Sequence, residues 1–180
     1  MSAQQVPQYI LSMASQAEFD RIDRRILALL AQNARITNQD LAAQVGLSPS
    51  SCLERVRGLR ERGVIRGVHA DLAPEALGVG MQALVAVRLR QHTRELVDGF
   101  QRYAASLPEV LQLYHVTGEE DFLVHVGCRD AHQLREFTLD AFTGRPEVAQ
   151  IHTSLIFEHV RKFGLPDYLG GQTDRRSEAQ

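Results

Sequence analysis

The 180-residue sequence predicts an α+β protein of two domains, a small helical bundle followed by a domain of alternating strands and helices. Three observations support this fold class. Up to residue 63, apolar residues recur at helical spacing between residues that cap helices. After residue 80, segments with strand-like alternation of apolar and polar residues are separated by segments with helical spacing. Between these patterns, residues 71–80 contain one proline and two glycines, so we expect a linker there.

The first domain is expected to contain three helices. Residues 20–32 carry apolar side chains at i, i+4, i+7 and i+8, which is one face of a helix. Thr37 can cap a short second helix over residues 38–45, and Ser48 can cap a third over residues 49–62. Gly46 suits the left-handed position that ends the second helix. After the third helix, the alternation in residues 64–70 predicts a strand.

The short glycine-containing turn between the last two helices is typical of a helix-turn-helix, although a plain three-helix bundle has the same outline. The third helix would expose hydroxyl, carboxylate and guanidinium groups, which bind base edges and phosphates. We therefore expect double-stranded DNA to be bound by Ser48, Ser50, Ser51, Glu54, Arg55, Arg57 and Arg66. Residues 20–70 hold nine arginines and five acidic residues, a net charge of +4, against −6 for the rest of the chain. This asymmetry favours a polyanion partner for the first domain.

The second domain reads βαββαβ. Strands are expected at residues 81–90, 110–117, 122–127 and 148–158, with helices at 93–106 and 130–142. This order predicts a ferredoxin-like antiparallel sheet with helices on one face. We expect the apolar residues of 81–89 and 148–156 to lie on the open face. Such a face needs a partner, so a homodimer is expected.

Composition excludes several other classes. The chain is 44% hydrophobic and 23% charged, which is typical of a soluble globular protein. Its longest uncharged apolar run, residues 81–87, is too short to span a membrane, and no secretory signal pattern opens the sequence, so a cytoplasmic location is expected. Cys52 and Cys128 suggest neither a disulfide framework nor a zinc site. The seven histidines lack metal-ligand spacing, so we expect no metal and no cofactor.

Four motifs occur in a diagnostic order. They are residues 19–23 with Ile26-Leu27, residues 41–48 with Arg55, Val56 and Leu59, residues 63–65, and residues 107–110 followed by 116–118 and Asp121. Together they resemble the leucine-responsive/asparagine regulator (Lrp/AsnC) family of transcription factors, over about residues 18–165. Two features depart from the family pattern. Phe19 stands where leucine is usual, and Gly144–Val148 reads GRPEV rather than ending in Pro-Gly-Val.

The resemblance implies a winged helix-turn-helix DNA-binding domain at residues 18–70 and a ferredoxin-like effector-binding and oligomerisation domain at 81–165. A flexible arm at 1–17 and a tail at 166–180 would flank them. The chain would be a sequence-specific transcriptional regulator, a dimer that assembles into tetramers or octamers and responds to an amino acid or related metabolite. The implied effector site comprises Val116, Thr117, Gly118, Glu119, Glu120, Asp121, Phe122, Glu136, Asp140, Ile151, His152 and Thr153.

Several of these residues also have a simpler interpretation. Gly118 and Asp121 are residue types that favour a turn, and Glu136 and Asp140 can belong to a solvated helix face. No nucleophile–base arrangement, Walker loop or GxGxxG motif is present, so we expect no enzyme activity. Two alternatives stay open: a sirohaem-type tetrapyrrole decarboxylase of the same architecture, and an amino-acid sensor that does not bind DNA.

Overall fold

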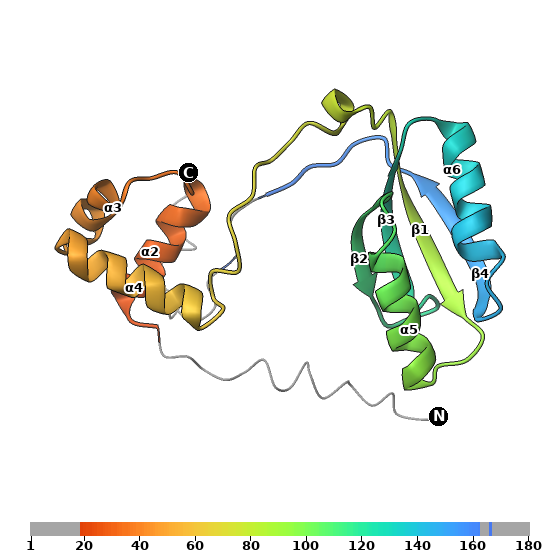
Figure 1. The fold of residues 1–180 in the computed structure, drawn as a ribbon, viewed down its shortest axis with the longest axis horizontal. Coiled ribbons are helices and arrows are strands. Elements are labelled where there is room, and N and C mark those ends of the chain that lie inside the picture. Colours follow the sequence, from red (N-terminus) through yellow and green to blue (C-terminus); the bar gives the residue numbers. More distant parts are fainter. Residues whose placement is uncertain (1–18, 163–165, 167–180) are drawn as a thin grey trace, which may run out of the picture. The chain divides into compact units, whose positions relative to one another are not determined.

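The computed structural model describes residues 19–162 and residue 166, which fall into two compact units. The first unit comprises residues 19–69 together with 161–162, and the second is Ala70–Val160 (Figure 1). The expected N-terminal arm lies outside the described residues, as does the expected tail apart from residue 166. Among the described helices, none is both long enough and apolar enough to cross a bilayer.

The three expected helices of the first unit are confirmed. They are α2 (Arg21–Gln32), α3 (Asn38–Val45) and α4 (Pro49–Glu61). Each begins after a side-chain cap, because the oxygens of Asp20, Thr37 and Ser48 accept from backbone N–H groups three residues ahead. Gly46 has a φ of 71° and ends α3 in the left-handed conformation. Their inward faces meet in a core made by Ile26, Leu29, Leu41, Ala42, Cys52, Val56 and Leu59.

The expected strand at residues 64–70 is absent from the structure. The backbone N–H groups of Val64 and Ile65 instead donate to the carbonyl of Leu59, at 3.0 and 3.2 Å, and continue the end of α4. Residues 66–73 then form no regular element, since no described segment pairs with them along a ladder. A short 3-10 helix, η1 (Pro74–Leu77), interrupts the expected linker.

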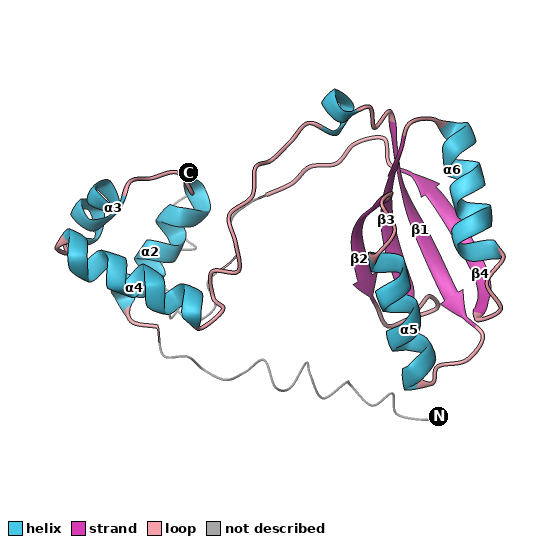
Figure 2. Ribbon diagram, viewed as in Figure 1, coloured by secondary structure: helices cyan, strands magenta, loops and turns pink. Residues whose placement is uncertain are grey.

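The second unit has the βαββαβ order that the sequence predicts (Figure 2). Its strands are β1 (Met81–Leu89), β2 (Val110–His115), β3 (Phe122–Cys128) and β4 (Val148–Leu155). Its helices are α5 (Arg94–Ala105) and α6 (Ala131–Thr138), and α6 passes into a π-helical turn, η2 (Leu139–Thr143). The sheet order is β2-β3-β1-β4 with antiparallel neighbours, which is the ferredoxin-like arrangement.

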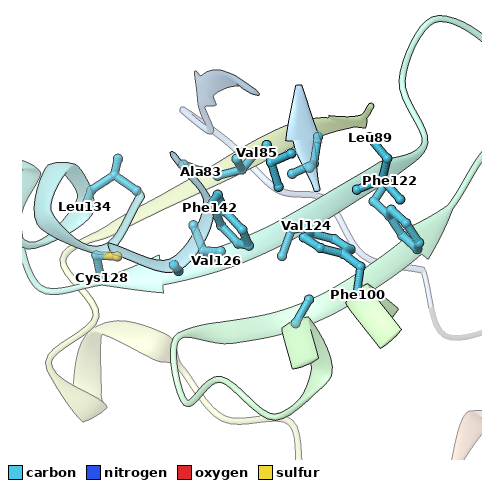
Figure 3. Packing of buried hydrophobic residues seen from close by; sticks show 14 residues of the cluster. Ala83, Val85, Leu89, Phe100, Phe122, Val124, Val126, Cys128, Leu134 and Phe142 are labelled. Carbon is cyan, nitrogen blue, oxygen red and sulfur yellow. The ribbon is translucent and has the colours of Figure 1, made fainter. Parts of the chain in front are cut away.

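One face of the sheet packs against both helices, and this face holds the core. Figure 3 shows Phe100 of α5 and Phe142 of η2 against Val124 and Phe122 of β3. The rings of Phe100 and Phe122 lie 4.8 Å apart between centroids. Interleaved aromatic and branched side chains at this density contribute most of the apolar burial of the unit.

The expectation about the open face was wrong. The side chains of Ala83, Val85 and Val87, which form the most apolar side of β1, are each 0% exposed and face the helices. Because side chains alternate across a strand, the open face receives the intervening residues of β1, namely Gln82, Leu84, Ala86 and Arg88. The open face is therefore a mixture of polar and apolar groups. The two helices cover the more apolar side of the sheet, because burying that side stabilises the unit more than burying the mixed side would.

Candidate nucleic-acid interface and effector loop

Helix α4 presents a polar surface opposite its buried side. Cys52, Val56 and Leu59 are 0%, 7% and 0% exposed and anchor the helix to the core. Ser48 fixes its start, because Ser48 Oγ accepts from the backbone N of Ser51 at 3.2 Å and donates to Ser51 Oγ at 2.9 Å. Residues spaced three and four apart then share the outward face, which carries Ser50, Ser51, Leu53, Glu54, Arg57, Arg60 and Glu61.

Six of the seven expected DNA-binding residues are exposed, and three of these carry charged side chains. Arg57 is 79% exposed and its only described partner is Glu61, one helical turn away at 3.0 Å. Glu54 and Arg66 are exposed and make no hydrogen bond or ion pair with any described residue. An exposed i,i+4 pair contributes about 0.3–0.5 kcal/mol, so Arg57 can exchange Glu61 for another anion at little cost.

Arg55 is placed differently from the sequence expectation. Its Nη1 lies 2.6 Å from Asp20 Oδ2 and 2.9 Å from Asp23 Oδ1, both at the start of α2. These contacts raise the pKa of Arg55, and the pKa of Asp20 is lowered first by the backbone N–H of Asp23 and then by Arg55. The guanidinium therefore holds α4 against α2 instead of facing outward with Arg57.

Two features of this unit were missed by sequence reasoning. Leu53 is 56% exposed on α4, although helical spacing from Ser50 and Arg57 could have revealed its outward position. Separately, three arginines of α2 line a depression beside α3, formed by Arg21, Ile22, Arg24, Arg25, Gln44 and Val45. The three arginines contribute to the positive charge of the first unit.

In the second unit, Asp121 fixes the end of the β2–β3 turn to β1. Its Oδ2 accepts from the backbone N of Leu89 at 2.7 Å, and its Oδ1 lies 2.8 Å from His92 Nε2. The Asp121 backbone carbonyl accepts from Val116 N, and its N–H donates to Val87 O. Every polar group of Asp121 is thus engaged in holding the turn, so the turn-forming interpretation of this residue is the one with structural support.

The expected effector residues do not all line one cleft. Phe122 is 0% exposed and belongs to the core of the unit. On β4, Ile151 and Thr153 pair with Val87 and Val85 and share the helix-covered face of the sheet. His152 pairs with Ala86 and lies on the open face. The alternation of side chains along a strand separates neighbours in this way.

The structure brings Glu120 of the turn into contact with His152 of β4. Glu120 Oε1 lies 3.4 Å from His152 Nδ1. Glu120 Oε2 is shielded from solvent and has no hydrogen-bond partner among the described residues. A shielded carboxylate oxygen without a donor costs free energy, which a cationic ligand group would recover. By contrast, Glu136 is exposed and paired with Arg135 at 2.8 Å, and Asp140 is exposed on η2.

A second polar group lies on the open face, at His125 of β3. His125 is 6% exposed, and its Nε2 lies 2.9 Å from Gln82 Oε1. Burial lowers the pKa of His125, and the neighbouring imidazole of His159 lowers it further. Burial disfavours the charged form of an imidazole, so His125 is neutral at neutral pH. Among the described residues, no cluster of three or more metal-ligating side chains is present.

Comparison with known proteins identifies both units. Residues 19–66 match the family described as winged helix-turn-helix DNA-binding, and residues 82–165 match the Lrp/AsnC ligand binding domain. The HTH-type transcriptional regulator AldR of Mycolicibacterium smegmatis is 44% identical, over 80% of this chain and 84% of that protein. The leucine-responsive regulatory protein of Rhizobium meliloti is 36% identical, over 83% and 96%. The crystal structure of a Neisseria meningitidis transcriptional regulator in complex with L-Met aligns with a TM-score of 0.73 and 32% identity, over 80% and 93%.

Proposed function

The chain belongs to the Lrp/AsnC family of DNA-binding transcriptional regulators, and from this we propose which of its surfaces bind DNA, effector and partner. Helix α4 enters the major groove with Ser50, Ser51, Glu54 and Arg57 toward the bases. Ser48, at the helix N-terminus, and Arg66 contact the phosphate backbone. Arg55 acts indirectly, by holding α4 in position against α2.

One observation carries this proposal. The exposed side of α4 holds a guanidinium, a carboxylate and hydroxyl groups, while its other side is anchored by three buried apolar residues. Arginine can donate two hydrogen bonds to guanine, and glutamate can accept one from cytosine. A rigidly anchored helix with such groups presents them at fixed spacing, as sequence-specific reading requires.

The test is binding of the full chain to duplexes selected from a randomised pool, followed by fluorescence anisotropy. Arg57→Ala should lower affinity for the selected duplex by about 1–3 kcal/mol if Arg57 contacts a base. Arg94→Ala is the matched control, because Arg94 is 90% exposed and also has an i,i+4 acidic partner, but lies on α5. Equal affinities for wild type and Arg57→Ala would contradict the proposal.

The second proposal concerns the effector, which we place at the β2–β3 turn beside β4. The backbone of residues 117–119, with Gly118 at a φ of 136°, gives a ligand carboxylate close access to N–H groups. Glu120 Oε2 supplies an acceptor for an ammonium group, which moves this role from Asp121 to its neighbour. An amino acid carries both groups. The similarity to a regulator crystallised with L-Met supports this class of ligand.

A thermal-shift screen of the twenty amino acids identifies the effector, because a ligand that binds the folded state raises its apparent stability. Glu120→Gln should abolish the shift of the best amino acid. Glu119→Gln is the control, since Glu119 is an exposed neighbour in the same turn. If Glu120→Gln retains the full shift, the ammonium is bound elsewhere.

The third proposal is that the open face of the sheet forms a homodimer, which assembles further into tetramers or octamers. Leu84, Ala86 and Leu123 lie half-buried on this face between polar groups, and a second copy would cover them. A twofold dimer presents two α4 helices to half-sites of a roughly palindromic operator. Leu84→Asp should shift the mass measured by light scattering toward the monomer.

This assignment leaves little support for the alternatives. The relatives are named as transcriptional regulators or regulatory proteins, and none of the features described above indicates a tetrapyrrole-binding site. A purified tetrapyrrole decarboxylase would be coloured with bound substrate, whereas the regulator would be colourless and shift duplex DNA. A sensor without DNA binding would respond to amino acids yet select no duplex. A regulator of chromosomal DNA acts in the bacterial cytoplasm, where two buried free thiols are stable.

A further inference from the structure

The recognition surface of α4 contains one apolar side chain that the fold does not use. Leu53 is 56% exposed, whereas Cys52, Val56 and Leu59 already anchor the helix. Within the described helices of the first unit, Leu53 is the one large apolar side chain that is exposed. A single exposed leucine is ordinary on a protein surface, so it is the position of Leu53 on α4 that makes it informative.

The position of Leu53 places it among the groups that face DNA. It follows Ser50 by three residues and precedes Arg57 by four, so these three side chains form one row along the helix. Arg55, two residues further on, is about 200° away around the helix and faces Asp23 of α2. Leu53 therefore points away from α2, beside the outward groups of α4.

The start of α3 is tied to the first turn of α4. Asn38 Nδ2 donates to the carbonyl of Pro49 at 2.8 Å, and Pro49 precedes Leu53 by one turn. Leu53 therefore lies one helical turn beyond the point where α3 is attached, in the N-terminal half of α4. The N-terminal residues of this second helix are the ones that a helix-turn-helix presents to base edges in the major groove.

Only one apolar group projects into the major groove from the base pairs, the C5 methyl of thymine. We propose that Leu53 packs on a thymine methyl in each half-site and so selects a T·A pair at one position, beside the contacts of Arg57. This proposal rests on the proposed function, because it needs α4 to be the reading helix. It adds a specificity determinant that hydrogen bonding alone does not supply.

Deoxyuridine gives a test that removes only the methyl group. The probe is the duplex that the full-length wild-type chain selects from a randomised pool, and each thymine in turn is replaced by deoxyuridine. Loss of one buried methyl-sized contact, at about 0.8 kcal/mol, corresponds to roughly fourfold weaker binding. We expect the wild type to lose about fourfold at each of two symmetric positions, and about fifteenfold when both thymines are replaced together. Leu53→Ala lacks the contact in both half-sites, so it should lose about fifteenfold on the thymine duplex and nothing further on the doubly substituted duplex.

The matched control is Leu77→Ala, because Leu77 is 69% exposed but lies in η1, outside the DNA-binding unit. It should keep the full deoxyuridine effect. Leu53→Met, which preserves an apolar side chain of similar volume, should retain most of it as well. A deoxyuridine effect of equal size in wild type and Leu53→Ala overturns the inference, and so does the absence of any such effect in the wild type. If the wild type selects no duplex at all, the proposed function fails first, which is a distinguishable result.

Discussion

Arg55 of α4 and Asp23 of α2, which are 32 positions apart, are joined by a contact of 2.9 Å between Arg55 Nη1 and Asp23 Oδ1. Asp23 is 7% exposed, and its Oδ2 also lies 3.7 Å from Nη2 of Arg62, the residue that caps the C-terminus of α4. One buried carboxylate thus fixes two points of the recognition helix. The orientation of α4 relative to α2 depends on this carboxylate as well as on the apolar core.

Asp23→Ala should therefore destabilise the first unit. It removes the charge-assisted hydrogen bond from Arg55, which keeps Asp20, and the 3.7 Å ion pair with Arg62. Such a loss typically costs about 1–3 kcal/mol. The free energy of unfolding is measured by urea titration of the full chain. Glu61→Ala is the control, because it breaks only the exposed pair with Arg57 and should cost less than about 0.5 kcal/mol. Similar losses for both variants would show that Asp23 does not anchor the helix.

Arg55 and Arg57 should differ in how they affect DNA binding. Arg57→Ala should weaken binding to the selected duplex, and its salt slope should fall by about one if the contact is to phosphate. Arg55→Ala should lower the free energy of unfolding, while its salt slope at a temperature where it is folded stays that of the wild type. Anisotropy titrations over a series of salt concentrations measure both slopes. A reduced slope for Arg55→Ala alone would reverse these assignments.

Asp121→Ala should lower the free energy of unfolding of the second unit and leave ligand binding by the folded protein largely intact. The substitution leaves the backbone N–H of Leu89 without its acceptor and removes the contact to His92, at a cost of about 1–3 kcal/mol. Urea denaturation with and without the amino acid that gives the largest thermal shift separates the effects. Asp121→Ala should retain a ligand-induced shift while it stays folded, whereas Glu120→Gln should unfold like wild type and lose that shift. The opposite pattern would return the ammonium-binding role to Asp121.

The lowered pKa of His125 predicts a pH dependence of stability. The folded state holds this imidazole below its ordinary pKa of 6.5, mainly through burial. As pH falls through about 6.5, the unfolded chain takes up the proton while the folded chain does not, so the free energy of unfolding decreases. The decrease ends once pH passes the lower folded pKa. Above about 6.5 both states are neutral at this position, and its contribution is constant.

His125→Gln should remove this part of the dependence, because glutamine is polar like histidine but does not titrate. Unfolding free energies at pH 7.5 and pH 5.5 should differ less for His125→Gln than for the wild type. His132→Gln serves as the control, since His132 is exposed on α6. Identical pH dependences for wild type and His125→Gln would show that His125 has no net effect.

The sequence predicted the helices and strands well where their determinants are local. Caps such as Ser48 and Asp130 bind an N–H three residues ahead, at 3.2 and 2.8 Å, and their partners are adjacent in the chain. Glycine at position 46 likewise marks the end of α3 by its own conformation. The strand expected at residues 64–70 failed because a strand exists only when another segment pairs with it, and alternation does not say whether one does.

The candidate sites divide in the same way. The outward face of α4 follows from helical spacing, so Ser50, Glu54 and Arg57 could be named from the sequence, and Leu53 could have been. Effector residues were predicted as a continuous segment with additions from β4. That approach could not reveal that Phe122 is part of the core or that Ile151 and His152 face opposite sides of the sheet.

By itself, the sequence determined the order of the elements, their caps and the family of the protein. These depend on residue types and spacings within a few positions of each other. Tertiary structure alone decided which side of β1 the helices cover and which acids hold Arg55. It also decided that Asp121 locks a turn while Glu120 keeps one oxygen unpaired. The reason is physical. An alternating strand offers two faces and a long side chain offers several directions, and the choice is made by whichever packing of distant segments buries the most apolar surface while satisfying the polar groups.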